Sequence, residues 1–171
     1  DACIQLRNEH RLQPADIAAV ELAVCPIVME LTAIKEPKTG LEGKFSIFHA
    51  AATALVFGAG GEAQFSDEAV RDPRVMALWP KVSATPDPAL RRISARATIR
   101  LTDGRTVTKN VDYALGTLKR PMSDADLEAK FRGLTDGIID TSRQDEFIRL
   151  CWSVAALPDA GALARAAVPS R

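Results

Sequence analysis

The residues whose types and spacing suit chemistry lie in the segment 43–58, which begins and ends at glycine and is otherwise rich in apolar side chains. This pattern predicts a helix, the clearest one in the chain. Because a helix turns by about 100° per residue, Ser46, His49 and Thr53 fall within one narrow arc of its surface. Lys44 lies in the first turn, an unusual place for a cation because the helix dipole there is unfavourable to positive charge. A histidine titrates near neutral pH, so His49 is a candidate general acid or base.

Ser46, His49 and Thr53 are called the polar seam below, and the sequence leaves two interpretations of it open. In the first, the seam is one wall of a ligand cleft in which His49 acts as acid or base. In the second, it is the solvent-facing side of the helix, with Ser46 and Thr53 bonded to backbone carbonyls. The pattern alone favours the second interpretation, because helices with an apolar majority usually keep one wet edge.

The other polar groups have simpler explanations. The acidic residues at 124–128 lie in the first turn of a predicted helix, where the dipole favours negative charge. The pair Lys119 and Arg120 suits an anionic ligand, although such a pair is more often part of a solvated loop. The segment GAGGEA at 58–63 lacks the strand-to-helix context of a phosphate loop. The sequence contains no nucleophile elbow, zinc motif or nucleotide fingerprint.

The composition narrows the class of protein. The 171 residues are 47% hydrophobic and carry 22 basic against 22 acidic side chains, so one domain with a real core can form. The charge balance argues against a nucleic-acid binder and against a polybasic membrane anchor, and no apolar run is long enough to span a bilayer. The three cysteines are scattered and odd in number, which predicts reduced core residues of a cytoplasmic protein. Together with two distant histidines they predict no metal site.

Hydrophobic periodicity predicts the strands. They are expected at 17–25, 81–86, 93–101 and about 107–113, with a hairpin turn at Asp103-Gly104. Apolar residues fill nearly every position of the first strand, which predicts burial on both of its faces.

Helices are expected between the groups of strands, at 2–12, 43–58, 66–72, from 73 to about 79, from 123 onward, 141–155 and 160–167. The predicted N-caps are Ser66, Asp72 and Ser123, and Thr141 with Gln144 resembles a capping box. The helix after Ser123 is expected to bury a stripe formed by Leu127, Phe131 and Leu134. The fold class is therefore predicted to be α+β, a two-layer sandwich with helices on one face of an antiparallel or mixed sheet.

Two segments resemble a known family. The run TGLEGKFSIFHAAATAL (39–55) and the run RPMSDADLEAKFRGL (120–134) are similar to signatures of the MmgE/PrpD family. That family includes 2-methylcitrate dehydratase, cis-aconitate decarboxylase and iminodisuccinate epimerase. Further matches fall in order around them, in LQPADIAAVEL, in FSDEAVRDPRVMAL and in the DGR hairpin, so the resemblance covers nearly the whole chain.

The resemblance implies a two-domain enzyme in which a large helical domain carries a smaller α+β lid. Residues 1–13 would then belong to, or link from, a helical domain encoded upstream of Asp1. Residues 14–120 would form the lid, and the helices of 121–171 would return to the helical domain. Relatives are typically homodimers, so a homodimer is expected here by analogy.

The resemblance also implies a reaction. Relatives abstract a proton next to a carboxylate of a small polycarboxylate and then dehydrate, decarboxylate or epimerise it, with no metal or organic cofactor. Lys44 and Ser46 match the family's KFS motif, which makes Lys44 a catalytic and substrate-binding candidate and Ser46 a substrate-binding candidate. His49, the second catalytic candidate, stands where many relatives have tyrosine, so the reaction type is not transferred. Most of the family's acids and bases lie upstream, and the isolated chain is expected to be inactive.

Two alternatives belong to other classes of protein. The chain would be a standalone α+β module that binds a small ligand, or a module that supplies a dimer contact. An initiator codon directly before Asp1 would favour either of these, whereas an upstream helical domain would favour the enzyme fragment.

Overall fold

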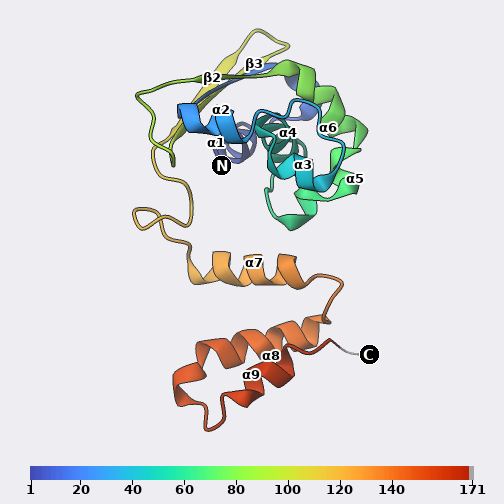
Figure 1. Ribbon diagram of the computed structural model, residues 1–171, viewed down its shortest axis with the longest axis vertical. Coiled ribbons are helices and arrows are strands. Elements are labelled where there is room, and N and C mark those ends of the chain that lie inside the picture. Colours follow the sequence, from blue (N-terminus) through green and yellow to red (C-terminus); the bar gives the residue numbers. More distant parts are fainter. Residues whose placement is uncertain (170–171) are drawn as a thin grey trace. The chain divides into compact units, whose positions relative to one another are not determined.

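The computed structural model describes residues 1–169 and divides the chain into two compact units, Asp1–Pro121 and a second that starts at Met122 (Figure 1). The first unit contains a mixed four-stranded sheet with helices, and the second contains helices only. The predicted α+β fold class is confirmed.

The sheet has the strand order β2-β1-β3-β4. Its members are β1 (Ile17–Val24), β2 (Val82–Pro86), β3 (Ala95–Leu101) and β4 (Thr106–Val111). Strand β1 runs parallel to β2 and antiparallel to β3, and β4 returns antiparallel to β3 through the predicted turn, where Gly104 has φ 89°. The register places Val20 between Val82 and Ile99, so three buried β-branched side chains form one row of the inner face.

One face of the sheet stays polar. The prediction that β1 is buried on both faces is wrong in the first five residues of the strand, because Glu21 is exposed and pairs with Arg100 of β3 at 3.4 Å. The other face is covered by α1 (Ala2–His10) and α4 (Ile47–Phe57), which lie together on one side of the strands in Figure 1. The side chains of Leu6 and Leu55, one from each helix, are completely buried there.

Shorter elements close the first unit around α4. They are α2 (Pro26–Leu31), α3 (Gly40–Lys44), α5 (Asp67–Val70), α6 (Pro73–Leu78) and 3-10 turns at 14–16, 62–65 and 79–81. Two predicted N-caps are confirmed, since the Ser66 side chain accepts from the Ala69 N–H and that of Asp72 accepts from the Arg74 N–H.

The second unit consists of α7 (Asp124–Thr135), α8 (Thr141–Trp152) and α9 (Gly161–Ala166), with a 3-10 turn at 154–156. Ser123 caps α7 as predicted, but α8 is capped by Asp140, whose Oδ1 accepts from the Arg143 N–H, and not by Thr141. The rings of Phe131 and Phe147 stack at 4.8 Å and join α7 to α8.

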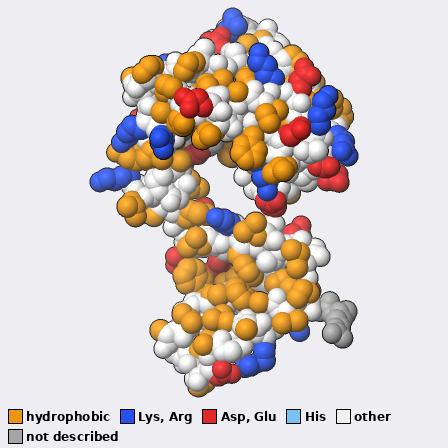
Figure 2. Space-filling view, in the orientation of Figure 1, with side chains coloured by type: hydrophobic (Ala, Val, Ile, Leu, Met, Phe, Trp, Pro, Cys, Tyr) orange, Lys and Arg blue, Asp and Glu red, His pale blue; other side chains and the backbone are white. Residues whose placement is uncertain are grey.

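The predicted buried stripe of α7 is not buried. No residue of α7 is buried, and Leu127 and Leu134 are exposed, because three short helices have too little surface to enclose an apolar face. Figure 2 shows hydrophobic side chains gathered over these helices. No helix among residues 1–169 is both long enough and apolar enough to cross a membrane.

Candidate functional site

The predicted helix at 43–58 is interrupted. Helix α3 ends at Lys44, and Ser46 adopts an extended conformation (φ −125°, ψ 107°) before α4 begins at Ile47. A short antiparallel bridge pairs Ser46 with Ala33 and holds this break open, and Ile47 donates its N–H to the Thr32 carbonyl at 2.8 Å. Lys44 therefore lies in the last turn of α3, where the helix dipole favours a cation. In one long helix Lys44 would stand in the first turn, where a cation is unfavourable. In the last turn of α3 a cation is favourable.

The polar seam lies in the core, so the interpretation that it is the solvent-facing side of the helix is wrong, although the Thr53 hydroxyl does bond to backbone carbonyls as that interpretation expected. Ser46, His49 and Thr53 are 1%, 0% and 0% exposed. The Ser46 Oγ caps α4 by accepting from the His49 N–H at 3.0 Å, and the Thr53 hydroxyl donates to the His49 carbonyl at 2.9 Å. Because both hydroxyls are satisfied by the helix's own backbone, they can be buried without facing solvent or a cleft.

His49 ties α4 to the loop that follows it. Its Nε2 lies 2.8 Å from the Gln64 carbonyl, and since a carbonyl only accepts, Nε2 carries the hydrogen. The other ring nitrogen, Nδ1, is buried and has no hydrogen-bond partner among residues 1–169. The ring stands edge-on to Phe65 and Trp79, with centroids 5.5 and 6.2 Å away. Burial lowers the pKa of His49, and the bond to Gln64 opposes this only in part, so the ring is neutral at pH 7.

The pKa of His49 makes the stability of the first unit depend on pH. In the unfolded chain the histidine pKa is about 6.5, so the unfolded state takes up a proton below that pH. In the folded state His49 stays unprotonated until the pH reaches its lower pKa. The free energy of unfolding is therefore expected to fall as the pH is lowered from 7.5 through 6.5 towards the depressed folded pKa. Urea unfolding followed by circular dichroism over this pH range measures the trend.

Two variants control this prediction. His49→Phe removes the titrating group and is expected to flatten the trend between pH 7.5 and 5.5, whereas His10→Asn, at an exposed position, should retain it. A pH trend that survives in His49→Phe would show that another group causes it.

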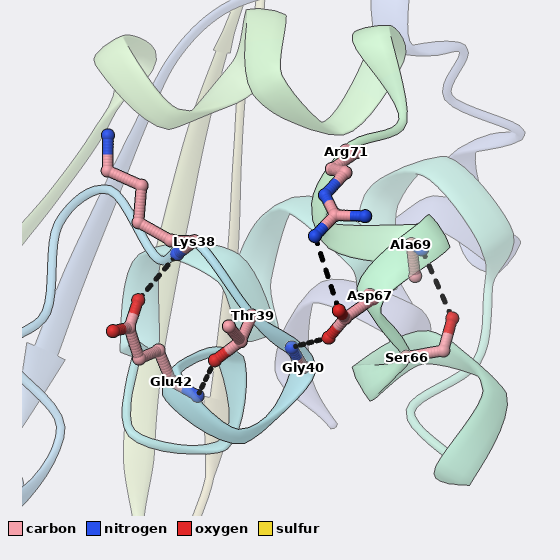
Figure 3. Close-up of polar contacts among 8 residues, drawn as sticks. All are labelled: Lys38, Thr39, Gly40, Glu42, Ser66, Asp67, Ala69 and Arg71. Carbon is pink, nitrogen blue, oxygen red and sulfur yellow. Dashed lines mark hydrogen bonds and ion pairs between the residues drawn. The ribbon is translucent and has the colours of Figure 1, made fainter.

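Two glycines let the chain close around this histidine. A Cβ on Gly40 would lie 2.2 Å from the Phe65 carbonyl oxygen, and a Cβ on Gly43 would lie 3.0 Å from the His49 ring. Figure 3 shows the hydrogen bond at Gly40, in which the Asp67 carboxylate accepts from the Gly40 N–H at 2.7 Å, and the pair that Asp67 forms with Arg71. The close approach of the Phe65 carbonyl to Gly40 and of the His49 ring to Gly43 explains why neither position has room for a side chain.

The start of α3 is fixed by its own polar groups. Figure 3 also shows the Thr39 hydroxyl accepting from the Glu42 N–H at 3.2 Å, while the Glu42 carboxylate accepts from the Lys38 N–H at 2.6 Å. This reciprocal cap fixes the first turn of the helix that ends in Lys44.

The accessible side chains of this region lie on or directly after α3 and on the 3-10 turn at 62–65. The Lys44 ammonium is 3.0 Å from a Glu62 carboxylate oxygen, and the two side chains are 45% and 62% exposed. Leu41 and Phe45 are exposed beside it in sequence, four residues apart. The sequence analysis missed Leu41 and Phe45, for which the i, i+4 spacing was an available signal. It also missed Glu62, for which the sequence carries no signal.

Residues 1–154 match the MmgE/PrpD C-terminal domain. The chain belongs to the MmgE/PrpD family. The resemblance of the segments 39–55 and 120–134 is thereby confirmed, as is the assignment to the family's C-terminal portion. No curated protein matches the sequence.

Within this MmgE/PrpD domain the predicted site residues are only partly brought together. Ser46 and His49 are bonded to each other in the core, while Lys44 stands on the preceding helix with its ammonium at the surface. Their catalytic and substrate-binding roles stay predictions. Among residues 1–169 no group of three or more His, Cys, Asp or Glu side chains is arranged to hold a metal ion.

Proposed function

We propose that this chain is the lid portion of a cofactor-independent lyase or isomerase that acts on a small polycarboxylate. The observation that supports it is the family match over residues 1–154, which includes both motifs. The assembled enzyme is proposed to be a cytoplasmic homodimer, as the resemblance implies.

The proposed chemistry begins at a carbon next to a carboxylate. A base removes the proton from that carbon, and the electron pair of the broken C–H bond moves into the carboxylate. The resulting enediolate then expels hydroxide from the next carbon or takes a proton back on the opposite face. In a decarboxylating enzyme the C–CO₂ bond breaks in place of the C–H bond, its electron pair moves through an adjacent C=C bond into another carboxylate, and the carbanion then takes up a proton as CO₂ leaves. In each case negative charge builds up on carboxylate oxygens, where a fixed cation stabilises the transition state.

Lys44 is the residue of this chain that suits the cation's role. Its ammonium is accessible, and its partner Glu62 is itself exposed, so a substrate carboxylate can replace that partner at little cost. Ser46 and His49 are proposed to be positioning residues that hold Lys44 in place and do not themselves contact the substrate. Ser46 caps the start of α4 two residues after Lys44, His49 holds the loop that follows α4, and together they fix where Lys44 stands. A substrate contact to Ser46 itself would require this packing to open.

The base and most of the substrate contacts are proposed to come from polypeptide outside residues 1–171. The second unit supports this, because it exposes an apolar groove of about 220 Å³ that another protein surface would cover. Its lining is formed by Leu127, Glu128, Phe131, Phe147, Ile148, Cys151 and Trp152. Residues 1–13 and 121–171 are accordingly proposed to adjoin a helical domain, with 14–120 as the lid.

Replacing Lys44 by alanine in the full-length parent enzyme is expected to lower kcat/KM by about 100-fold, because a fixed cation at the developing charge is lost. The stability of the fold should change by less than about 1 kcal/mol, since the lost ion pair is exposed. Turnover is measured with 2-methylcitrate, cis-aconitate and iminodisuccinate.

The matched control is Lys38→Ala, an exposed lysine in the loop before α3, which should leave turnover unchanged. A Lys44→Ala enzyme within threefold of the parent would refute the assignment of Lys44. Turnover by residues 1–171 alone would refute the proposal that the site is incomplete in this chain.

A further inference from the structure

A polar pocket lies in the first unit, where β4 runs into the loop that leads to Pro121. Its volume is about 280 Å³, and its lining is formed by Gln5, Asn110, Val111, Asp112, Tyr113, Lys119 and Arg120. Lys119 and Arg120 are the pair that the sequence left undecided between an anion site and a solvated loop. Neither residue has a part in the proposed function.

The loop that carries this pair is held in place. Residues Thr117 and Arg120 form a short bridge, in which Gly116 donates its N–H to the Arg120 carbonyl at 2.8 Å. The Arg120 guanidinium donates to the Asp1 carboxylate at 2.6 Å, and the Leu115 N–H donates to the same oxygen. The pocket wall is therefore formed before any ligand arrives.

Three groups on the lining are available to a ligand. Lys119 and the Asp112 carboxylate form no side-chain hydrogen bond or ion pair within residues 1–169, although Arg91, which donates to the Asp112 carbonyl at 3.1 Å, lies close enough for its charge to attract that carboxylate. The Tyr113 hydroxyl accepts from Arg91 at 3.0 Å, so its own hydrogen is left to donate. The Arg91 guanidinium also lies over the Tyr113 ring at 4.4 Å and fixes its orientation.

The charges decide what kind of ligand fits. Lys119 and Arg120 provide two positive charges on the lining and Arg91 a third beside it, while Asp112 and the Asp1 that binds Arg120 provide two negative ones. Since Arg120 is paired with Asp1, a ligand with one negative and one positive end can pair with Lys119 and with the exposed Asp112 carboxylate at once, whereas a polyanion would meet that carboxylate.

We propose that this pocket binds the α-amino-carboxylate part of a free amino acid. The ligand carboxylate lies at Lys119 and accepts the Tyr113 hydroxyl hydrogen, and the ligand ammonium donates to Asp112. This site takes a different class of ligand from the polycarboxylate proposed for Lys44, and it does not depend on that proposal.

The test is a titration of the folded 171-residue chain with L-alanine, L-lactate and L-alaninamide, followed by ¹H–¹⁵N NMR. Lactate replaces only the ammonium by a hydroxyl, and alaninamide replaces only the carboxylate. Alanine is expected to bind with a Kd of about 1–10 mM and to shift the amides of 110–120, with the two analogues at least fivefold weaker.

Two variants identify the groups. Lys119→Ala should weaken alanine binding at least fivefold, while Lys109→Ala, whose lysine pairs with Glu9 away from the pocket lining, should not. Asp112→Ala should abolish the preference for alanine over lactate. Amide shifts that spare 110–120, equal binding of the three ligands, or unchanged binding by Lys119→Ala would each overturn the proposal. None of these readouts involves turnover, so the outcome is independent of the Lys44 experiment.

Discussion

Replacing Gly40 by alanine is expected to destabilise the first unit by about 3 kcal/mol, the upper end of what overpacking usually costs. The added Cβ would lie 2.2 Å from the Phe65 carbonyl oxygen and 3.0 Å from the Ser66 carbonyl carbon. Both are backbone atoms, which cannot rotate away as a side chain can. Relief requires α3 to move away from the 65–66 backbone, and this movement breaks the bond from the Gly40 N–H to Asp67.

Urea unfolding followed by circular dichroism measures this loss, and hydrogen exchange of residues 40–57 locates it. Gly133→Ala in α7 is the matched control, because a Cβ there meets nothing within 4 Å. Since alanine is favoured over glycine inside a helix, that variant should be neutral or more stable by up to about 1 kcal/mol. An unfolding midpoint of Gly40→Ala equal to that of the parent would contradict the steric account.

The strands could be predicted because their pattern is local. Alternation in 95–101 and the Asp103-Gly104 turn were sufficient to place β3 and β4. The exposure of Glu21 was not predictable in the same way. A run of apolar residues carries the same signal whether one face or both are covered, and the Arg100 that pairs with Glu21 is 79 residues away in sequence.

The break between α3 and α4 could not be predicted from helical periodicity. No proline interrupts the apolar segment, and an apolar helix continues through Phe45 and Ser46 as well as it stops there. The break is caused by the bridge from Ser46 to Ala33, a tertiary contact. The error had a large consequence, because it placed Lys44 on the same helix as the polar seam and so joined a surface cation to a buried histidine.

For the helices of the second unit, the positions in the sequence were predictable but the burial of their side chains was not. Their positions and the Ser123 cap followed from the sequence, but the predicted burial of Leu127 and Leu134 was wrong, because both side chains are exposed. An apolar stripe on a helix indicates that something covers it, and periodicity cannot say whether that cover belongs to the same 171 residues.

Replacing His49 by alanine is expected to destabilise the first unit by about 3 kcal/mol, within the range for emptying a buried position of this size. The change leaves a cavity between Phe65 and Trp79 and removes the donor from the Gln64 carbonyl. His10→Ala on the exposed side of α1 is the control and should cost less than about 0.5 kcal/mol. Urea unfolding of both variants at pH 7.5 gives the comparison.

A third variant separates a positioning role of His49 from a catalytic one. Glutamine keeps an N–H that can reach the Gln64 carbonyl but cannot act as a general acid or base near pH 7. If His49 only positions α4 and its loop, the full-length His49→Gln enzyme, assayed where it remains folded, should retain kcat within about tenfold and keep the parent's pH profile. If His49 transfers a proton to or from substrate, kcat should fall by about 100-fold or more at unchanged stability, and one limb of the profile should disappear. Because the ring is fully buried and already bonded, the first outcome is the one expected.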